Sequence, residues 1–338
     1  MTDVMPGRIP PASTEDPVES DRQGIAAFNR AVGALDPAMV DVAIASAREA
    51  FGPIPAPICE VSATADLLAL DLQRAVQRRV RRLYTWLGAA LVVFGVTNLF
   101  EYAVVAYVVA LGVLALVVYR FRRAREEDRF LDYRALAEGL RVLGWWRAAG
   151  IEASAAERYP GRHQEAIGWV RAAVAAIERA AGSSGAALPD VGRVRSRWVR
   201  DQAEYFRRKS DQVRGAARRW DRVLGVAVAL SIAVAIGYAA TLMLFDAAGT
   251  LAGPRFQSML GVIAGVGVTA QAYQTKQGYA ELANQFRLMH RLFEQADQDL
   301  EARPGRAREI LLRLGDEALQ ENTEWLAYHR RHPVELVT

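Results

Sequence analysis

Long uncharged runs divide this chain into alternating apolar and polar blocks. Between Leu83 and Tyr119 the only charged residue is Glu101. At 1.5 Å per residue, one helix of that length would be much longer than the ~30 Å hydrocarbon core of a bilayer, so the run is predicted to fold back on itself. The expected hairpin has helices at about 83–99 and 103–119, joined by a polar turn at 97–102.

A second pair of uncharged runs lies later in the chain, at about 223–245 and 256–275. The segment between them, "DAAGTLAGPR", contains the Gly and Pro residues that are typical of a loop. Four runs of this length, paired as two hairpins, favour membrane spans over buried helices of a soluble protein. The predicted fold is therefore an all-α membrane protein, in which two transmembrane helical hairpins (four transmembrane helices) extend into a cytoplasmic helical bundle.

Arginine-rich segments flank these runs and predict their orientation. They precede the first run at 74–82, follow the second at 120–125 and precede the third at 207–222. Cytoplasmic loops carry the excess of positive charge, so both termini and the middle segment are expected in the cytoplasm and the chain in the cell inner membrane. The two turns carry little charge: Glu101, Asp246 and Arg255. The sequence pI of about 9.3 then needs no nucleic-acid partner.

The remaining segments are predicted to be helical or disordered. Residues 1–22 are rich in Pro, Ser and acidic side chains and are expected to form a disordered tail. A helix is expected near 23–50, within an N-terminal helical segment that ends at 64. The main domain is predicted to cover 65–333, with cytoplasmic helices in 120–222 and 276–333. The polar segment that precedes the first span is predicted to continue into that span as one helix. The second and fourth spans are predicted to continue as helices past the membrane. Because no apolar h-region precedes residue 83, no cleavable signal peptide is expected.

Two patterns near the C-terminal half predict helix packing. Apolar residues recur at alternating spacings of three and four, which is a heptad pattern that could pack on helices of the same chain or on a second subunit. They are Tyr279, Leu282, Phe286, Met289, Phe293, Ala296 and Leu300. Small residues at Gly261, Gly265 and Thr269 recur every four residues and should allow a close helix approach, within or between subunits.

Four segments in order resemble one family. They are "DYRALAEGLRVLGWWRAAG" (132–150), "WVRDQAEYF" (198–206), "YAELANQFRLMHRLFEQA" (279–296) and "EALQENTEWLAYHRRHP" (317–333). Together they resemble the SLATT-type (SMODS and SLOG-associating) membrane effector domains, over roughly residues 65–333. The resemblance implies a homo-oligomeric, pore-forming or membrane-perturbing effector of a bacterial conflict system, activated by a nucleotide-derived signal. The N-terminal residues lack the alternating strands and phosphate loop of a sensor domain, so a separate nucleotide-sensing protein is expected as partner.

The segment 132–150 contains the candidate site for a signal or partner. Arg134, Glu138 and Arg141 lie at i, i+4 and i+7, which predicts an Arg-Glu-Arg ladder along one helix face. Leu136, Leu140, Leu143 and Trp146 form a neighbouring apolar face that should pack on the bundle. The ladder could be an intramolecular brace. Alternatively, with Trp198 and Arg200, it could bind an anionic ligand or an acidic partner surface.

The spans contain few polar residues, and these are the candidates for a pore or its mouth: Asn98, Glu101, Thr269 and Gln271. Glu101 could equally be a simple turn residue, since it lies at the predicted apex. The four histidines show no ligand spacing with carboxylates, and a single cysteine, Cys59, excludes an internal disulfide. No catalytic, metal or cofactor site is therefore expected. Two functions stay open: a membrane effector, or a membrane-anchored scaffold that binds a soluble sensor.

Overall fold

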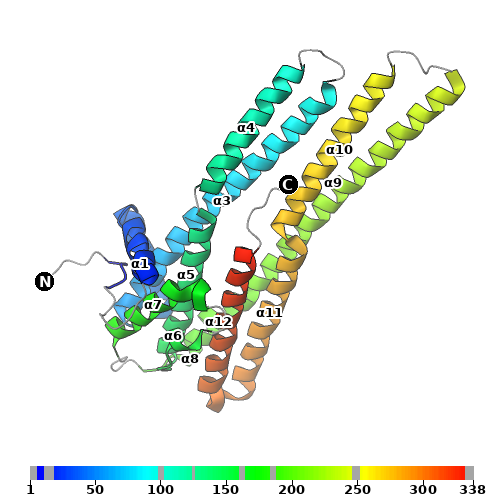
Figure 1. The fold of residues 1–338 in the computed structure, drawn as a ribbon. Coiled ribbons are helices and arrows are strands. Elements are labelled where there is room, and N and C mark those ends of the chain that lie inside the picture. The colour runs from blue at the N-terminus through cyan, green and yellow to red at the C-terminus, as the bar shows by residue number, and fades with distance from the viewer. Residues whose placement is uncertain are drawn as a thin grey trace. The chain divides into compact units, whose positions relative to one another are not determined.

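A computed structural model describes residues 6–10, 19–97, 103–123, 126–159, 164–182, 188–245 and 252–331. Every regular element within these ranges is a helix, which confirms the all-α part of the predicted fold (Figure 1). The longer helices are α1 (Glu19–Val32), α2 (Pro37–Phe51), α3 (Ala56–Val96), α4 (Ala103–Arg123), α5 (Glu126–Ala148), α7 (Gln164–Ala181), α9 (Asp201–Phe245), α10 (Ala252–Gln277), α11 (Tyr279–Ala302) and α12 (Ala307–Arg331). Short elements are α6 (Ala155–Arg158), α8 (Val191–Val194), the π-helix η2 (Arg195–Arg200) and the 3-10 turn η3 (Pro304–Arg306).

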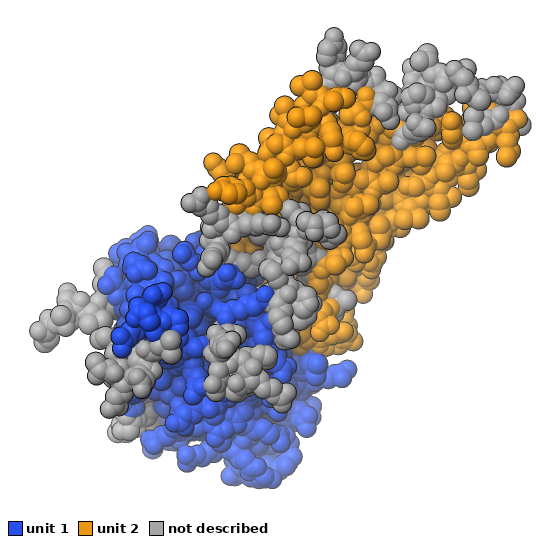
Figure 2. Space-filling model, viewed as in Figure 1, with its two compact units in different colours: residues 1–75, 126–206, 288–338 blue, residues 76–125, 207–287 orange. Residues whose placement is uncertain are grey.

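The chain divides into two compact units (Figure 2). Unit 1 comprises residues 1–75, 126–206 and 288–338, and unit 2 comprises 76–125 and 207–287. The helices α3, α9 and α11 each contribute residues to both units. Helices α3 and α9 therefore run from segments predicted for the bundle into apolar segments predicted for spans, whereas all of α11 lies in a segment predicted to be cytoplasmic.

The N-terminal helix predicted near 23–50 is instead two helices, α1 and α2. The break comes at Asp36, whose side chain accepts a hydrogen bond from the Ala38 backbone N–H at 3.0 Å. Pro37 follows in the first turn, where its fixed φ and missing N–H favour a helix start. A capping residue followed by proline therefore divides the predicted helix in two.

The prediction of disorder throughout 1–22 also needs correction. Helix α1 begins at Glu19, and Ile9 is buried in the core of unit 1. The Ile9 backbone N–H donates to the Asn29 side-chain oxygen, and the Asn29 amide donates to the Ile9 carbonyl, both at 2.9 Å. Composition indicated disorder because it takes no account of a partner twenty residues away along the chain.

Helix α5 lies within the core of unit 1, where it packs against α12, α7, α6, α2 and α8. Its predicted apolar face is confirmed, because Leu136, Leu140, Leu143 and Trp146 are fully buried. The Trp146 indole N–H donates to the Leu311 carbonyl of α12 at 3.0 Å. A Cβ at Gly315 would lie 2.4 Å from the Trp146 ring, so α12 approaches α5 this closely only because residue 315 is glycine.

The heptad pattern packs within this chain where it lies in unit 1. Met289, Phe293, Ala296 and Leu300 are buried, and the Phe293 ring contacts Phe206 of α9. The fourth span, however, does not continue as one helix. Gly278 adopts φ +56 between α10 and α11, a left-handed conformation that interrupts the helix and that glycine accommodates without strain.

In unit 2, α3 and α10 pack closely through small residues. A Cβ at Gly265 would lie 2.9 Å from the Leu91 side chain, and one at Gly261 would lie 3.6 Å from the Gly95 Cα. The small-residue face predicted on the fourth run therefore meets α3 of the same chain. Aromatic contacts join the other neighbours: Phe94 with Tyr107 of α4, and Trp220 of α9 with Tyr273 of α10.

Within the described residues, one helical segment, Val191–Thr241, contains a stretch long and apolar enough to cross a membrane, and that stretch is only 6% buried. Val104–Arg120 is a shorter apolar helix. The apolar part of α3 runs only from Leu83 to the end of the helix at Val96, and α10 has Ser, Thr, Gln and Gly among its apolar residues. The four-span arrangement therefore stays a prediction.

Candidate functional site

Arg141 is held between two carboxylates of its own chain. Its guanidinium donates to Glu138, one turn earlier on α5, at 2.7 Å, and to both oxygens of Asp66 on α3 at 2.9 and 2.8 Å. These two negative charges raise the pKa of Arg141 above its ordinary value, although burial opposes them. The Glu138–Arg141 part of the predicted ladder is thus formed, and Asp66 braces α5 to α3 within unit 1.

Arg134 takes a different partner. Its guanidinium carbon lies 4.8 Å from the centroid of the Trp325 ring of α12, a cation–π contact. Trp325 also meets the Phe130 ring edge-on at 6.1 Å. Arg134 therefore contributes to the α5–α12 contact, and the structure does not place it in one cluster with Arg141.

A third polar contact joins three helices through Asp132. The Trp169 indole N–H of α7 donates to Asp132 at 3.0 Å, and Arg330 of α12 forms an ion pair with it. Burial raises the pKa of Asp132, although Arg330 and the Trp169 hydrogen bond act in the opposite direction. The sequence did not predict this contact, because Asp132, Trp169 and Arg330 are far apart in the chain.

Trp198 is a core residue, which corrects its assignment to a ligand surface. Its side chain is buried, and its ring stacks on Trp145 of α5 at 6.3 Å with an interplanar angle of 8°. The Phe293 ring meets it edge-on at 5.9 Å. Trp198 therefore offers no surface to a ligand. Its side chain instead packs between the aromatic rings of Trp145 and Phe293.

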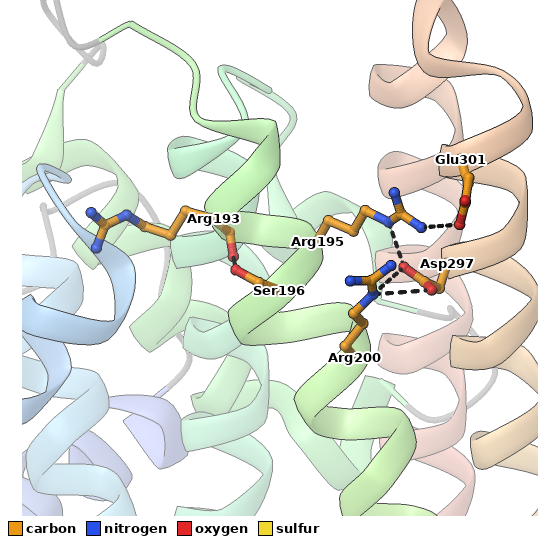
Figure 3. Close-up of polar contacts among 6 residues, drawn as sticks. All are labelled: Arg193, Arg195, Ser196, Arg200, Asp297 and Glu301. Carbon is orange, nitrogen blue, oxygen red and sulfur yellow. Dashed lines mark hydrogen bonds and ion pairs between the residues drawn. The ribbon is translucent and has the colours of Figure 1, made fainter.

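Arg200 belongs instead to an ion-pair cluster at the π-helix η2 (Figure 3). Arg195 donates to Asp297 of α11 at 2.5 Å and to Glu301 at 2.6 Å, and Arg200 donates to both Asp297 oxygens at 3.0 and 3.1 Å. The i→i+5 hydrogen bonds of a π-helix bring residues five apart to the same face, so both arginines reach one carboxylate. The heptad and α-helical periods contain no signal of this π-turn.

The cluster also determines the ionisation of Asp297. Burial disfavours its charged form, but the hydrogen bonds from Arg195 and Arg200 outweigh burial and hold the pKa of Asp297 below its ordinary value. A carboxyl group whose pKa is depressed on folding stabilises the fold above its unfolded pKa, and this contribution is lost as the pH falls through the folded pKa. The cluster should therefore stabilise the protein at neutral pH and weaken in acid.

We expect Asp297→Asn to lower the free energy of unfolding at pH 7 by about 1.5–3 kcal/mol, because both guanidinium groups lose a charged acceptor. The difference from wild type should shrink toward pH 3, where the native carboxyl is itself becoming protonated. Urea unfolding of the purified protein at both pH values measures this. Asp201→Asn, at an exposed residue on α9, is the matched control and should change neither value. An equal loss at both pH values would contradict the electrostatic explanation.

The single cysteine is buried in the core of unit 1. Burial raises the pKa of Cys59 to about 11, with Arg48 acting against it and Glu60 with it. At pH 8 only about one such thiol in a thousand is ionised, and the thiolate is the reactive form.

Native protein should therefore stay unlabelled by a thiol reagent at pH 8, whereas urea-unfolded protein reacts fully. Rapid labelling of the native protein would show that this core opens.

Of the four candidate pore residues, the structure describes two, Thr269 and Gln271, both on α10. Thr269 donates to the Gly265 carbonyl of its own helix at 2.8 Å, and a Cβ at Gly88 would lie 3.5 Å from its methyl group. Gln271 is exposed elsewhere on α10. Asn98 and Glu101 lie outside the described residues. Within the parts of the chain that the structure describes, no three His, Cys, Asp or Glu side chains are arranged to hold a metal ion.

Comparison with known proteins matches only one part of the chain. Residues 64–149 match a family described as "Protein of unknown function (DUF4231)". No curated protein and no solved structure matches. The matched segment runs from the polar part of α3 through α4 to the end of α5, so it includes Asp66 and Arg141. The resemblance to SLATT-type effectors over 65–333 stays a prediction.

Proposed function

We propose that this chain is a multi-pass protein of the cell inner membrane, crossing the bilayer with two helical hairpins and keeping both termini in the cytoplasm. The exposed apolar surface of α9 carries the proposal. Such a surface is unfavourable in water, at about 25 cal/mol for each Å², whereas lipid is its matching solvent. The exposed residues are Val223, Val226, Val228, Leu230, Ile232 and Ile236.

Two further observations support insertion into lipid. Helix α4 exposes a similar surface at Val104, Val105, Val108 and Val109. The hydroxyl groups on α9 bond to their own helix: Ser231 donates to the Ala227 carbonyl at 2.9 Å and Thr241 to the Gly237 carbonyl at 2.8 Å. Polar groups in hydrocarbon need such internal partners, because no water is available to them.

In this membrane the chain acts as a pore-forming or membrane-perturbing effector, as its resemblance to SLATT-type domains implies. A nucleotide-derived signal, received by a separate sensing protein in an infected or stressed bacterial cell, activates it. Four mostly apolar helices cannot line a wet channel alone, so the active form is a homo-oligomer. The signal reaches the spans through α3, α9 and α11, the helices that contribute to both units.

A membrane-anchored scaffold is the second candidate function, and one observation favours it. Ser231, Thr241 and Thr269 all donate their hydroxyls to their own helices, which leaves few polar groups in the described parts of the predicted spans to line a pathway. In this alternative the hairpins only tether unit 1, which binds a soluble partner without conduction. Lipid remains a partner in both cases.

Topology mapping tests the membrane assignment itself. Cysteines introduced at Asn98 and at Thr250 should react with a membrane-impermeant maleimide added outside intact cells, because both turns are expected on the far side. Wild type is the control, since its single cysteine is buried. Labelling of both positions only after lysis, or recovery of the chain in the soluble fraction, would overturn the assignment.

A flux assay separates the effector from the scaffold. Purified protein in dye-loaded liposomes should release dye when the activating extract or nucleotide is added together with the sensor, and crosslinking should show an oligomer under the same conditions. Dye retained under all activating conditions, with the protein inserted, would leave the scaffold as the function.

A further inference from the structure

The two hairpins are preceded by similar polar segments. "DLQRAVQRRVRRL" (71–83) leads into the first, and "DQVRGAARRWDRV" (211–223) into the second. Aspartate and arginine recur at the same spacings in both segments. The matched pairs are Asp71 with Asp211, Arg74 with Arg214, Arg78 with Arg218, Arg79 with Arg219, and Arg82 with Arg222.

The segments after the hairpins are also similar. "YRALAEGLRVL" (133–143) and "YAELANQFRLM" (279–289) share Tyr, Leu, Ala and Arg at matched positions. Their local contacts agree as well, because Arg141 donates to Glu138 and Arg287 donates to Asn284, each three residues earlier. The chain therefore contains two diverged copies of one hairpin module. The family match at 64–149 covers the first copy, and residues around 204–295 form the second.

In the part of the chain that the structure describes, two of the arginines retained before each hairpin lack the carboxylate partners that hold several guanidinium groups of unit 1. Examples in unit 1 are Arg141 with Asp66 and Arg158 with Asp316. In unit 2 the arginines at the start of the apolar segments are exposed, and no carboxylate within the described ranges forms an ion pair with them. These are Arg78 and Arg82 in the first copy and Arg218 and Arg222 in the second.

Each pair lies on one helix face that becomes apolar at the next turn. Arg78 and Arg82 are four residues apart, and Trp86, four residues further, is 42% exposed. On α9, Arg218 and Arg222 are followed at the same spacing by Val226 and Leu230, both exposed. Both copies therefore place two exposed guanidinium groups directly before an exposed apolar side chain, although Ala90, which matches Leu230 in position, is buried.

We propose that these two faces, Arg78/Arg82 and Arg218/Arg222, are equivalent binding sites for anionic phospholipid on the cytoplasmic leaflet. Guanidinium groups bind the headgroup phosphate through paired N–H donors. The acyl chains then lie along Trp86 in one copy and along Val226 and Leu230 in the other, and an interfacial tryptophan suits that depth. A free phosphate ion would use only the arginines and leave the apolar part of the face uncovered. This inference rests on the proposed membrane insertion.

The test compares lipids at the surface of the reconstituted full chain. Electron paramagnetic resonance of spin-labelled phosphatidylglycerol and phosphatidylcholine gives the association constant of each with the protein. Wild type should prefer phosphatidylglycerol by at least about fivefold, the effect expected from one basic residue at the membrane surface, since each site has two. Arg78→Gln/Arg82→Gln and Arg218→Gln/Arg222→Gln should each reduce the number of selective sites by half, and the quadruple variant should show no preference.

Controls separate the competing outcomes. Arg179→Gln/Arg308→Gln, at exposed residues of unit 1, should keep the wild-type preference. A quadruple variant that floats with the vesicles and still prefers phosphatidylglycerol would overturn the inference alone, whereas wild type that fails to float would overturn the membrane assignment. Loss of the preference in inorganic phosphate, but not in chloride of equal ionic strength, would show a free-anion site and overturn the lipid site.

Discussion

Trp146→Ala should lower the free energy of unfolding of unit 1 by about 3–5 kcal/mol, the usual cost of truncating a large buried aromatic side chain. Trp146 lies on α5, and its side chain is fully buried where α5 packs against α12, so its removal leaves a cavity. The change also removes the donor to the Leu311 carbonyl and the ring that Arg158 covers at 5.9 Å. Urea unfolding in mild detergent, followed by circular dichroism and limited proteolysis, measures the loss.

A double-mutant cycle with Gly315 identifies the contact responsible. Gly315→Ala alone should destabilise unit 1, because its Cβ would lie 2.4 Å from the Trp146 ring. In the Trp146→Ala background the same change should cost little, since the ring is absent. Leu188→Ala, at a residue 90% exposed, is the control and should leave stability unchanged. Equal costs of Gly315→Ala in both backgrounds would contradict this packing.

Ile232→Arg/Ile236→Arg should remove the protein from the membrane fraction. These side chains are 54% and 64% exposed on α9, and each arginine near the centre of a span costs about 2.5–3.5 kcal/mol of insertion free energy. Ile232→Val/Ile236→Val keeps the surface apolar and should insert normally. If α9 faced water instead, the two arginines would increase the soluble yield, so fractionation of cell lysates distinguishes the two cases by the direction of the change.

Periodicity predicted those parts of the fold that depend on neighbouring residues along one helix. The buried face of α5 and the packed residues Met289 to Leu300 follow from apolar spacing, and the Glu138–Arg141 pair follows from charges one turn apart. The long helix α3 follows from the absence of a breaker between its polar and apolar parts. These features need no knowledge of which helices meet.

The candidate site was predicted less well, because its contacts join distant segments. Asp66, the partner of Arg141, lies 75 residues away, and Arg330 pairs with Asp132 across 198 residues. Trp198 has charged neighbours in sequence, yet a π-turn directs Arg195 and Arg200 to α11 while the tryptophan enters the core. A helical period of 3.6 residues places these three side chains incorrectly when the local hydrogen bonding is i→i+5.

The position of α12 has a consequence for shortened forms of this protein. The segment matched to the family ends at residue 149. The apolar face of α5, however, is covered by α12, which follows more than a hundred and fifty residues later. A chain truncated after the matched segment would expose Leu140 and Trp146 to solvent. Such a fragment is expected to pair with a helix of a second molecule or to aggregate. Truncation at the family boundary is therefore a poor way to obtain a stable monomeric domain.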